Sequence, residues 1–327
     1  MGFALAFFAL LTEALAGYPN ALAARIGHPV GWMSALIRRA DRAWKDHTLS
    51  LARLRLRGIL ALATVLLVTV SCVLLIDRGL DLVLPVLVAL VIKAIMASVL
   101  IAGRTLDERV SAVADALETR GIEAGRAALD RITERETKGL DEAGVSRVAI
   151  ESLANGFSEG LVAPVVWLAA AGLPGCAMFK AISTAGGMSG VSSTSDPQRA
   201  FGWAAFRLDS LANWPTARLS VLWLAAAARI MPQACWRTAM LSALRDGPRH
   251  RDLNAGWPEA AMAGALSLAL AGPTMRGGRR IDNAWMGAGR RAATPADIQR
   301  ALRLYRIAYV LQAVTIGLLA LIAVAVF

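Results

Sequence analysis

One stretch of the sequence decides the fold: Glu151-Ser-Leu-Ala-Asn-Gly-Phe-Ser-Glu-Gly160, then an apolar run from Leu161 to Phe179, then Lys180-Ala-Ile-Ser-Thr-Ala-Gly-Gly-Met-Ser-Gly190. We predict polar, glycine-rich turns on both sides of one hydrophobic helix. Glycines let a backbone come close to a ligand, and the Glu, Ser, Thr and Lys side chains beside them supply acceptors, hydroxyls and a positive charge, which suits an anionic substrate. The same pattern fits two helix ends beside a membrane, since Gly and Ser are common where membrane helices pack.

The composition indicates an integral membrane protein. The chain has 327 residues, of which 56% are hydrophobic and only 18% charged, so it is too apolar for an ordinary soluble domain and long enough for several spans. A formal net charge of +11 does not indicate nucleic acid binding here, because no recognisable reading module accompanies it. Three isolated cysteines and three scattered histidines argue against a disulfide framework and a zinc site.

Hydropathy predicts four membrane spans, at residues 1–18, 58–76, 82–102 and 307–327. The first lacks the basic region of a signal peptide, so we expect it to be retained. The polar run from Asp77 to Asp81 is the expected turn between the second and third spans. Glu13 should face other helices, and Lys93 either reaches toward the interface or is a functional charge inside the membrane.

The region between the third and last spans is predicted to be helical and cytoplasmic. Residues 103–155 alternate charges with apolar side chains at helical spacing, and Asp141 and Glu142 suit a helix start. The apolar runs at 219–231 and 260–270 are short for a span and are expected to be buried or re-entrant helices. The run at 161–179 is expected to be buried or re-entrant as well, because a true span there, paired with one at 219–231, would place Lys180 and Asp209 outside, away from ATP. The loops 233–256 and 273–306 are rich in arginine, which places them in the cytoplasm and both termini outside.

These observations predict an all-α, polytopic, multi-pass protein of the cell membrane, either inner or plasma. The expected organisation is one domain over residues 1–327. It has N-terminal spans in 1–102, a cytoplasmic-side helical region in 103–306 and a last span in 307–327.

Several motifs resemble the CobD/CbiB family of cobalamin biosynthesis across almost the whole chain. The most specific are Asn254-Ala-Gly-Trp-Pro-Glu-Ala-Ala-Met-Ala-Gly-Ala-Leu266, Gly-Pro273 with Gly277-Gly278, Trp285-Met-Gly-Ala-Gly-Arg290 and Asp297-Ile-Gln-Arg-Ala-Leu302. Others, in the same order as in the family, are His28-Pro-Val-Gly-Trp, Leu140-Asp-Glu-Ala-Gly-Val, Ile150-Glu-Ser-Leu-Ala, Ala163-Pro-Val-Val-Trp167, Lys180-Ala and Phe201-Gly-Trp. The resemblance implies a synthase that joins 1-amino-2-propanol, or its O-phosphate, to the free carboxylate of adenosylcobyric acid. It also implies ATP and Mg²⁺.

The sequence departs from the family pattern where the chemistry is expected. Asn155-Gly-Phe-Ser-Glu-Gly stands where the family usually has Glu-Asn-x-x-Asp-Gly, and Gly186-Gly187 stands where it has Asp-Ser. Ser210 replaces the second acid of an Arg-Asp-Asp helix, while Glu159 and Asp209 each retain a carboxylate.

Charged and amide side chains in these motifs are the candidates for the site. We predict catalytic roles for Glu159, Lys180, Asp209 and Glu259, and substrate-binding roles for Thr184, Arg207, Asn213, Arg218, Asn254 and Trp257. The cations suit phosphate contacts, the acids suit Mg²⁺ or an incoming ammonium group, and the remaining polar groups suit orientation. Glu159 and Asp209 are the candidate Mg²⁺ ligands, because Mg²⁺ is held through one or two carboxylates plus phosphate oxygens. Each residue also has an ordinary structural explanation, such as a helix-end charge.

Two other classes of function stay open. A transporter would place more charges inside long spans and repeat its halves, and neither feature is visible. A non-catalytic membrane paralogue, or a scaffold for a cobamide assembly complex, would tolerate the lost acids and is the main alternative. Expected partners are membrane lipid, the corrinoid and the amine, with no nucleic acid; a homo-oligomer or a soluble partner is also possible.

Overall fold

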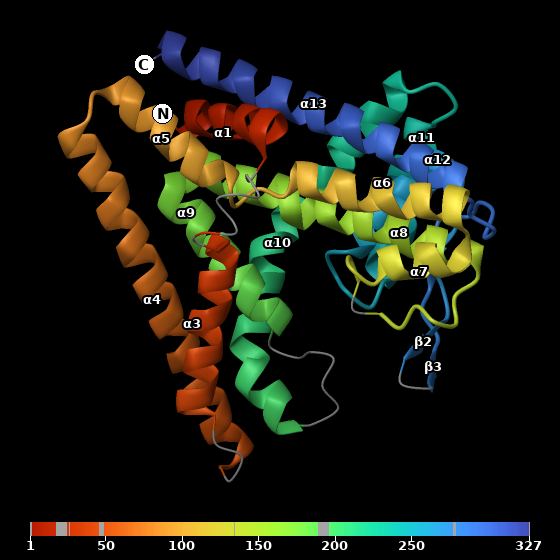
Figure 1. Cartoon of the computed structure of the whole chain (residues 1–327), viewed down its shortest axis with the longest axis horizontal. Helices are drawn as coiled ribbons and strands as arrows, with labels where there is room; N and C mark the ends of the chain where they lie inside the picture. Colours follow the sequence, from red (N-terminus) through yellow and green to blue (C-terminus); the bar gives the residue numbers. More distant parts are fainter. Residues whose placement is uncertain are drawn as a thin grey trace. The chain divides into compact units, whose positions relative to one another are not determined.

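The computed structural model describes residues 2–17, 25, 27–45, 49–133, 135–188, 196–276 and 279–326, with the side chains of 196 and 274–281 left out (Figure 1). Ser189, Gly190 and the Gly277-Gly278 motif therefore lie outside the described residues. The chain divides into two compact units. The first unit is Met1–Ile101, Ala163–Asn213 and Ile316–Phe327; the second unit is Ala102–Val162 and Trp214–Thr315.

The predicted all-α membrane fold is confirmed. Four helical segments are long and apolar enough to cross a membrane: Leu51–Val83, Val86–Arg120, Glu142–Met188 and Pro295–Val326. The predicted first span forms helix α1 (Gly2–Ala16), whose 15 residues fall short of the ~20 that a spanning helix needs. Glu13 on α1 is 2% exposed, as expected for an acid that faces other helices.

The first unit packs apolar helices on one another through small residues. Its other helices are α3 (Pro29–Trp44), α4 (Leu51–Val83), α5 (Val86–Ser98), α9 (Ala163–Met188) and the first part of α10 (Asp196–Ile230). Helix α9 contacts α1, α4 and α5, and the Trp167 indole of α9 donates to the Ala212 carbonyl of α10 at 3.3 Å. Helix α9 therefore packs against most of the other helices of this unit.

The turn between the second and third predicted spans is displaced. Residues 77–81 are helical, and the chain reverses instead at Leu84 and Pro85, between α4 and α5 (Figure 1). Lys93 explains why polar residues continue the helix: its Nζ lies 2.8 Å from both Asp77 and Asp81. A charge that was expected to reach the interface or to serve a function thus forms a double ion pair between the two helices.

The glycine-rich turn predicted around residues 155–160 is also wrong. Helix α8 (Glu142–Gly156) continues through a π-helical segment, η1 (Phe157–Val162), directly into α9. The chain breaks instead inside the apolar run, at Ala171 and Gly172, where Gly172 has φ 64°. Glycine is the residue that adopts such a left-handed conformation without steric cost.

The second unit is also mainly helical. Besides α8 and η1 it contains α6 (Gly103–Arg120), α7 (Ile122–Leu129), the end of α10 from Trp214 onward, α11 (Trp236–Asp246), a 3₁₀ turn η2 (Gly247–Arg249), α12 (Gly256–Leu266) and most of α13 (Pro295–Val326). The helical prediction for 103–155 is confirmed, and Asp141 caps α8 by accepting from the Gly144 amide at 2.7 Å. Two short antiparallel pairs join β1 (Leu270–Ala271) to β4 (Trp285–Met286), and β2 (Thr274–Arg276) to β3 (Arg279–Ile281).

Three further boundaries need correction. Residues 219–231 are not a short separate helix but almost entirely the end of the 35-residue α10, because Pro215 does not interrupt it. The short buried helix predicted at 260–270 exists as α12, beginning four residues earlier. The predicted loop 273–306 ends at Pro295, where α13 begins with Asp297 accepting from the Thr294 amide at 2.8 Å.

Candidate functional site

Arg218 is the centre of the first polar group, in the second unit. Its guanidinium carbon lies 4.7 Å from the Trp214 ring and 4.6 Å from the Trp257 ring, close enough for cation–π attraction to both. One of its nitrogens donates to the Asn254 Oδ1 at 3.0 Å. Three predicted substrate-binding residues, Arg218, Asn254 and Trp257, are thus brought together. Burial lowers the pKa of the Arg218 guanidinium, which nevertheless stays charged at neutral pH.

Short-range hydrogen bonds position Asn254. The Asp252 carboxylate accepts from the amides of Asn254 and Ala255 at 2.8 and 3.0 Å, and the Asp252 amide donates to the His250 Nδ1 at 3.0 Å. Asp and His side chains favour such local turns because they satisfy backbone groups that no helix has yet paired. The turn leads into α12 and fixes the start of that helix.

Glu259 lies in the first turn of α12 and is 3% exposed. Its Oε2 is 3.5 Å from the His250 Nε2, and this oxygen has no hydrogen-bond partner among the described residues. Burial raises the pKa of the Glu259 carboxyl well above its ordinary value, and the nearby Glu151 adds to the shift. A buried acid with a raised pKa keeps its proton to higher pH than an ordinary glutamate, which is a property found among general acids and bases.

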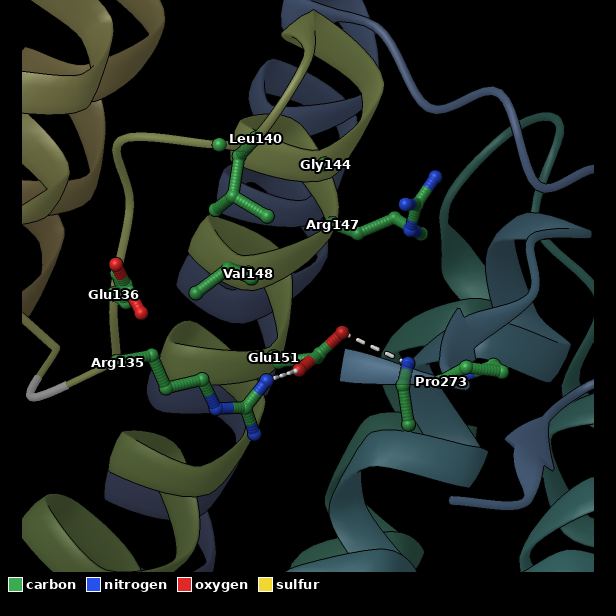
Figure 2. A pocket seen from close by; sticks show the side chains of 10 residues that line it. Arg135, Glu136, Leu140, Gly144, Arg147, Val148, Glu151 and Pro273 are labelled. Atoms are coloured by element: carbon green, nitrogen blue, oxygen red, sulfur yellow. Dashed lines mark hydrogen bonds and ion pairs between the residues drawn. The ribbon is translucent and has the colours of Figure 1, made fainter. Parts of the chain in front are cut away.

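Glu151 is a site residue that the sequence-based selection missed. It is 3% exposed on α8; one of its carboxylate oxygens pairs with Arg135, and the other accepts from the Ala271 amide at 2.8 Å. Figure 2 shows both interactions as dashed lines. The sequence did carry a signal for it, because Glu151 stands in the motif Ile150-Glu-Ser-Leu-Ala. Glu151 raises the pKa of the Arg135 guanidinium through its negative charge.

A cavity of about 350 Å³ opens beside Glu151 (Figure 2). One face of α8 forms part of its wall, and residues before α8 and after β1 complete it. The lining residues are Arg135, Glu136, Gly139, Leu140, Gly144, Arg147, Val148, Glu151, Ala271 and Pro273. None of the ten residues selected from the sequence lines this cavity.

Five of the sequence candidates belong to the first unit, on α9 and α10. Asp209 accepts from the Asn213 Nδ2 at 2.7 Å, so this predicted pair is in contact. The Thr184 hydroxyl donates to the Lys180 carbonyl at 2.7 Å, as is common for threonine inside a helix. Lys180 is half-buried, and Arg207 is exposed on α10. Gly186 packs so closely on Asp209 that a Cβ at 186 would lie 2.7 Å from the Asp209 Cβ.

The candidates therefore form two groups, one in each unit. Asp209, Asn213, Lys180, Thr184 and Arg207 belong to the first, and Glu159, Arg218, Asn254, Trp257 and Glu259 to the second. Among the described residues, no three His, Cys, Asp or Glu side chains are gathered as metal ligands. The assignment of Mg²⁺ to Glu159 and Asp209 stays a prediction.

Comparison with known proteins places this geometry in a family. The family model described as CobD/Cbib protein matches residues 6–305. A "Cobalamin biosynthesis protein CobD" from Sinorhizobium fredii is 42% identical over 310 residues, covering 91% of this chain and 90% of that protein. A protein of the same name from Rhodobacter capsulatus is 40% identical over 307 residues, covering 94% of this chain and 93% of that protein. No solved structure matches the chain. The chain belongs to the CobD/Cbib family.

Proposed function

We propose that this protein forms an amide bond in cobalamin biosynthesis, between the free carboxylate of adenosylcobyric acid and the amine of 1-amino-2-propanol or its O-phosphate. The family match over residues 6–305, with relatives named cobalamin biosynthesis proteins, is the observation that carries the proposal. The product is adenosylcobinamide or its phosphate. The four membrane-capable helices support a multi-pass location in the cell membrane.

The reaction makes two demands on the protein. A carboxylate does not condense with an amine unaided, so ATP supplies the activation of the carboxylate, and the amine must lose a proton as it attacks. Glu259 has the environment for that second task, because burial raises the pKa of its carboxyl and so makes its carboxylate a stronger base than an ordinary glutamate. His250, 3.5 Å away, can relay the proton toward solvent.

Arg218 is suited to bind negative charge. Two tryptophan rings and the Asn254 amide oxygen hold its guanidinium in place, which fixes the direction of its remaining N–H donors. Fixed donors stabilise charge that develops during a reaction at no cost of reorganisation. Trp214 is 58% exposed and supplies an apolar face that suits a flat corrinoid ring.

The acids suit a Mg²⁺ ion that is held partly by phosphate oxygens, not one held by protein ligands alone. The described residues offer no cage of three or more protein ligands, but Mg²⁺ commonly takes one or two carboxylates and completes its shell with water and phosphate oxygens. Under this proposal Glu159 in the second unit and Asp209 in the first unit each remain a candidate for such a carboxylate.

The test is product formation by membranes that contain the protein. Membranes are incubated with adenosylcobyric acid, ATP, Mg²⁺ and either 1-amino-2-propanol or its O-phosphate, and adenosylcobinamide species are detected by mass spectrometry. We expect an ATP-dependent product from the native protein. The exposed Glu118→Gln variant serves as the matched control for Glu259→Gln. A second test asks whether the protein restores growth of a strain that lacks its own synthase and is fed cobyric acid. If a well-folded native protein makes no product and does not restore growth, the scaffold alternative is supported instead.

A further inference from the structure

The cavity beside Glu151 carries an arrangement of charge that the proposed function has not used. Its floor is apolar, formed by Leu140 and Val148, and Arg147 lies at one side of that floor (Figure 2). Glu136 lies at the other side of Leu140 and Val148 in the same view, so its carboxylate does not neutralise Arg147. Arg135 differs from Arg147, because its charge is already paired with the buried Glu151.

Arg147 and Arg291 both lie against the ring of Trp285. The guanidinium carbons of Arg147 and Arg291 lie 5.7 and 4.6 Å from the centre of the Trp285 ring. An Arg147 nitrogen also donates to the Arg291 backbone carbonyl at 2.6 Å. Within the described part of the chain, neither guanidinium forms an ion pair with a carboxylate. Two positive charges therefore lie beside the Trp285 ring. Arg147, the one that lines the cavity, is oriented by this ring and by the Arg291 carbonyl.

An anion would complete this arrangement. Both guanidinium groups lie within about 6 Å of the centre of one ring, so an anion bound beside Arg147 would be attracted by two positive charges. The planar fork of an arginine matches the oxygens of a phosphate and forms charge-assisted hydrogen bonds with them. The volume of about 350 Å³ is near the lower end of the range for small-molecule sites, which is roughly 300–1,000 Å³, so the cavity suits a small ligand and not a whole corrinoid.

We propose that this cavity binds the phosphate of a small phosphate-bearing substrate, with Arg147 as the direct contact and Arg291 as the second positive charge. The inference rests on the proposed function, whose small substrates include two that carry phosphate: ATP and the O-phosphate of 1-amino-2-propanol. Both offer the same chemistry to Arg147, and the experiment separates them.

The experiment measures binding without turnover. Detergent-solubilised full-length protein is titrated calorimetrically, in the absence of adenosylcobyric acid, with ATP, with 1-amino-2-propanol O-phosphate and with free 1-amino-2-propanol. For the phosphate-bearing ligand of the cavity, Arg147→Gln should weaken binding by about 10- to 100-fold, the usual effect of losing a charge-assisted hydrogen bond. Arg291→Gln should weaken it less, and Arg147→Lys, which keeps the charge but loses the fork, should lie between. Arg109→Gln removes an exposed arginine that does not line the cavity and should change the affinity by less than about twofold.

The outcomes separate the two proposals. Weakened binding of ATP alone, or of the phosphorylated amine alone, assigns the cavity to that substrate. The cavity assignment is overturned if Arg147→Gln and Arg291→Gln bind both ligands with unchanged affinity, or if the native protein binds neither ligand. If the same variants still form product with unchanged KM, the proposed function stays intact. Binding that depends on Arg147 in a native protein that makes no product would instead support the cavity and contradict the synthase. Thermal unfolding confirms that each variant is folded, and Arg147→Lys replaces Arg147→Gln if the latter is not.

Discussion

Glu259 is the residue on which the proposed chemistry depends most. Its carboxyl is buried in the first turn of α12, close to His250, and both burial and the charge of Glu151 raise its pKa. Glu259→Gln keeps the size of the side chain but cannot accept a proton, so product formation should fall by about 10²- to 10⁴-fold. In the native protein, kcat should fall as the pH is lowered through the raised pKa. A pH–rate profile checks this, and wild-type turnover by Glu259→Gln would contradict the assignment.

The same residue gives a prediction for stability. Because the folded state raises the Glu259 pKa above the ordinary 4.5, it holds the proton more tightly than the unfolded chain does. Ionisation therefore costs folding free energy as the pH rises above the unfolded value, and this cost is absent at lower pH. Relative to Glu259→Gln, the native protein should lose Tm as the pH is raised from 5 to 8. Thermal unfolding of both proteins checks it; a constant difference in Tm would show that the carboxyl is ionised without penalty.

Gly186 allows α9 to lie directly against Asp209. A Cβ at this position would be 2.7 Å from the Asp209 Cβ, a separation that neither side chain can relieve by rotation. Gly186→Ala should therefore destabilise the protein by about 1–3 kcal/mol, the usual cost of overpacking. The next residue supplies the control, because a Cβ on Gly187 meets nothing within 4 Å. Purified variants compared by thermal unfolding should show a loss of Tm for Gly186→Ala alone; equal behaviour of the two would refute the close packing.

At the scale of the helices, Lys93 joins α4 to α5. It lies 2.8 Å from both Asp77 and Asp81, so replacing it leaves two carboxylates close together without their cation. Removing one partner of such a group is more harmful than removing all of it. Lys93→Met should lower the amount of folded protein in the membrane, and adding Asp77→Asn and Asp81→Asn should restore it. Immunoblots of membranes after detergent extraction measure the amounts. Equal levels for the native and single-variant proteins would mean that the ion pairs contribute nothing to stability.

Sequence patterns predicted the helices well and the breaks between them poorly. Apolar periodicity reveals which face of 103–155 is buried, and Asp141 marks the start of α8, because both are local properties. The polar residues Asp77 and Asp81 suggested a turn, yet a lysine twelve to sixteen residues away lets them stay in a helix. Gly156 likewise suggested a turn, but a Cβ there would lie 2.6 Å from the Leu106 side chain, so its small size serves packing.

In the candidate site, too, local motifs were predicted and contacts between distant segments were not. Arg218, Asn254 and Trp257 were found because they stand in recognisable motifs, and they do contact one another. Glu151 and Ala271 are 120 residues apart and joined by a hydrogen bond that only the folded chain reveals. Arg147 and Arg291 are 144 residues apart and meet at Trp285 in the same way. Leu140, Glu151 and Pro273 stand in motifs too, but the sequence does not reveal that these distant segments line one cavity.

For the whole molecule, helix lengths and arginines predict how the chain crosses the membrane. Helix α4 has 33 residues and α13 has 32, so each is about 50 Å long at 1.5 Å per residue, well above the ~30 Å of the hydrocarbon core. The excess lies at the arginine-bearing ends, since Arg53, Arg55 and Arg57 are in the first turns of α4. Arginine is enriched on the cytoplasmic side of spans. We therefore expect the start of α4 and of α13 inside the cell, and the Leu84–Pro85 turn and the C-terminus outside. This topology requires Glu142–Met188, which is broken at Ala171 and Gly172, to be re-entrant and not to cross the membrane.

Reporter fusions at four positions test this topology. Alkaline phosphatase, which is active only outside the cytoplasm, should be active when fused after Pro85 or at the C-terminus, and inactive after Lys138 or Arg290. A cytoplasm-active fluorescent reporter at the same positions should give the opposite pattern, which controls for unstable fusions. Lys138 and Arg290 lie between membrane-capable helices, so they report on the segments that carry Glu151 and the motif around Asn254. Because ATP is cytoplasmic, phosphatase activity after Arg290 would contradict both the topology and an ATP-dependent site in the second unit.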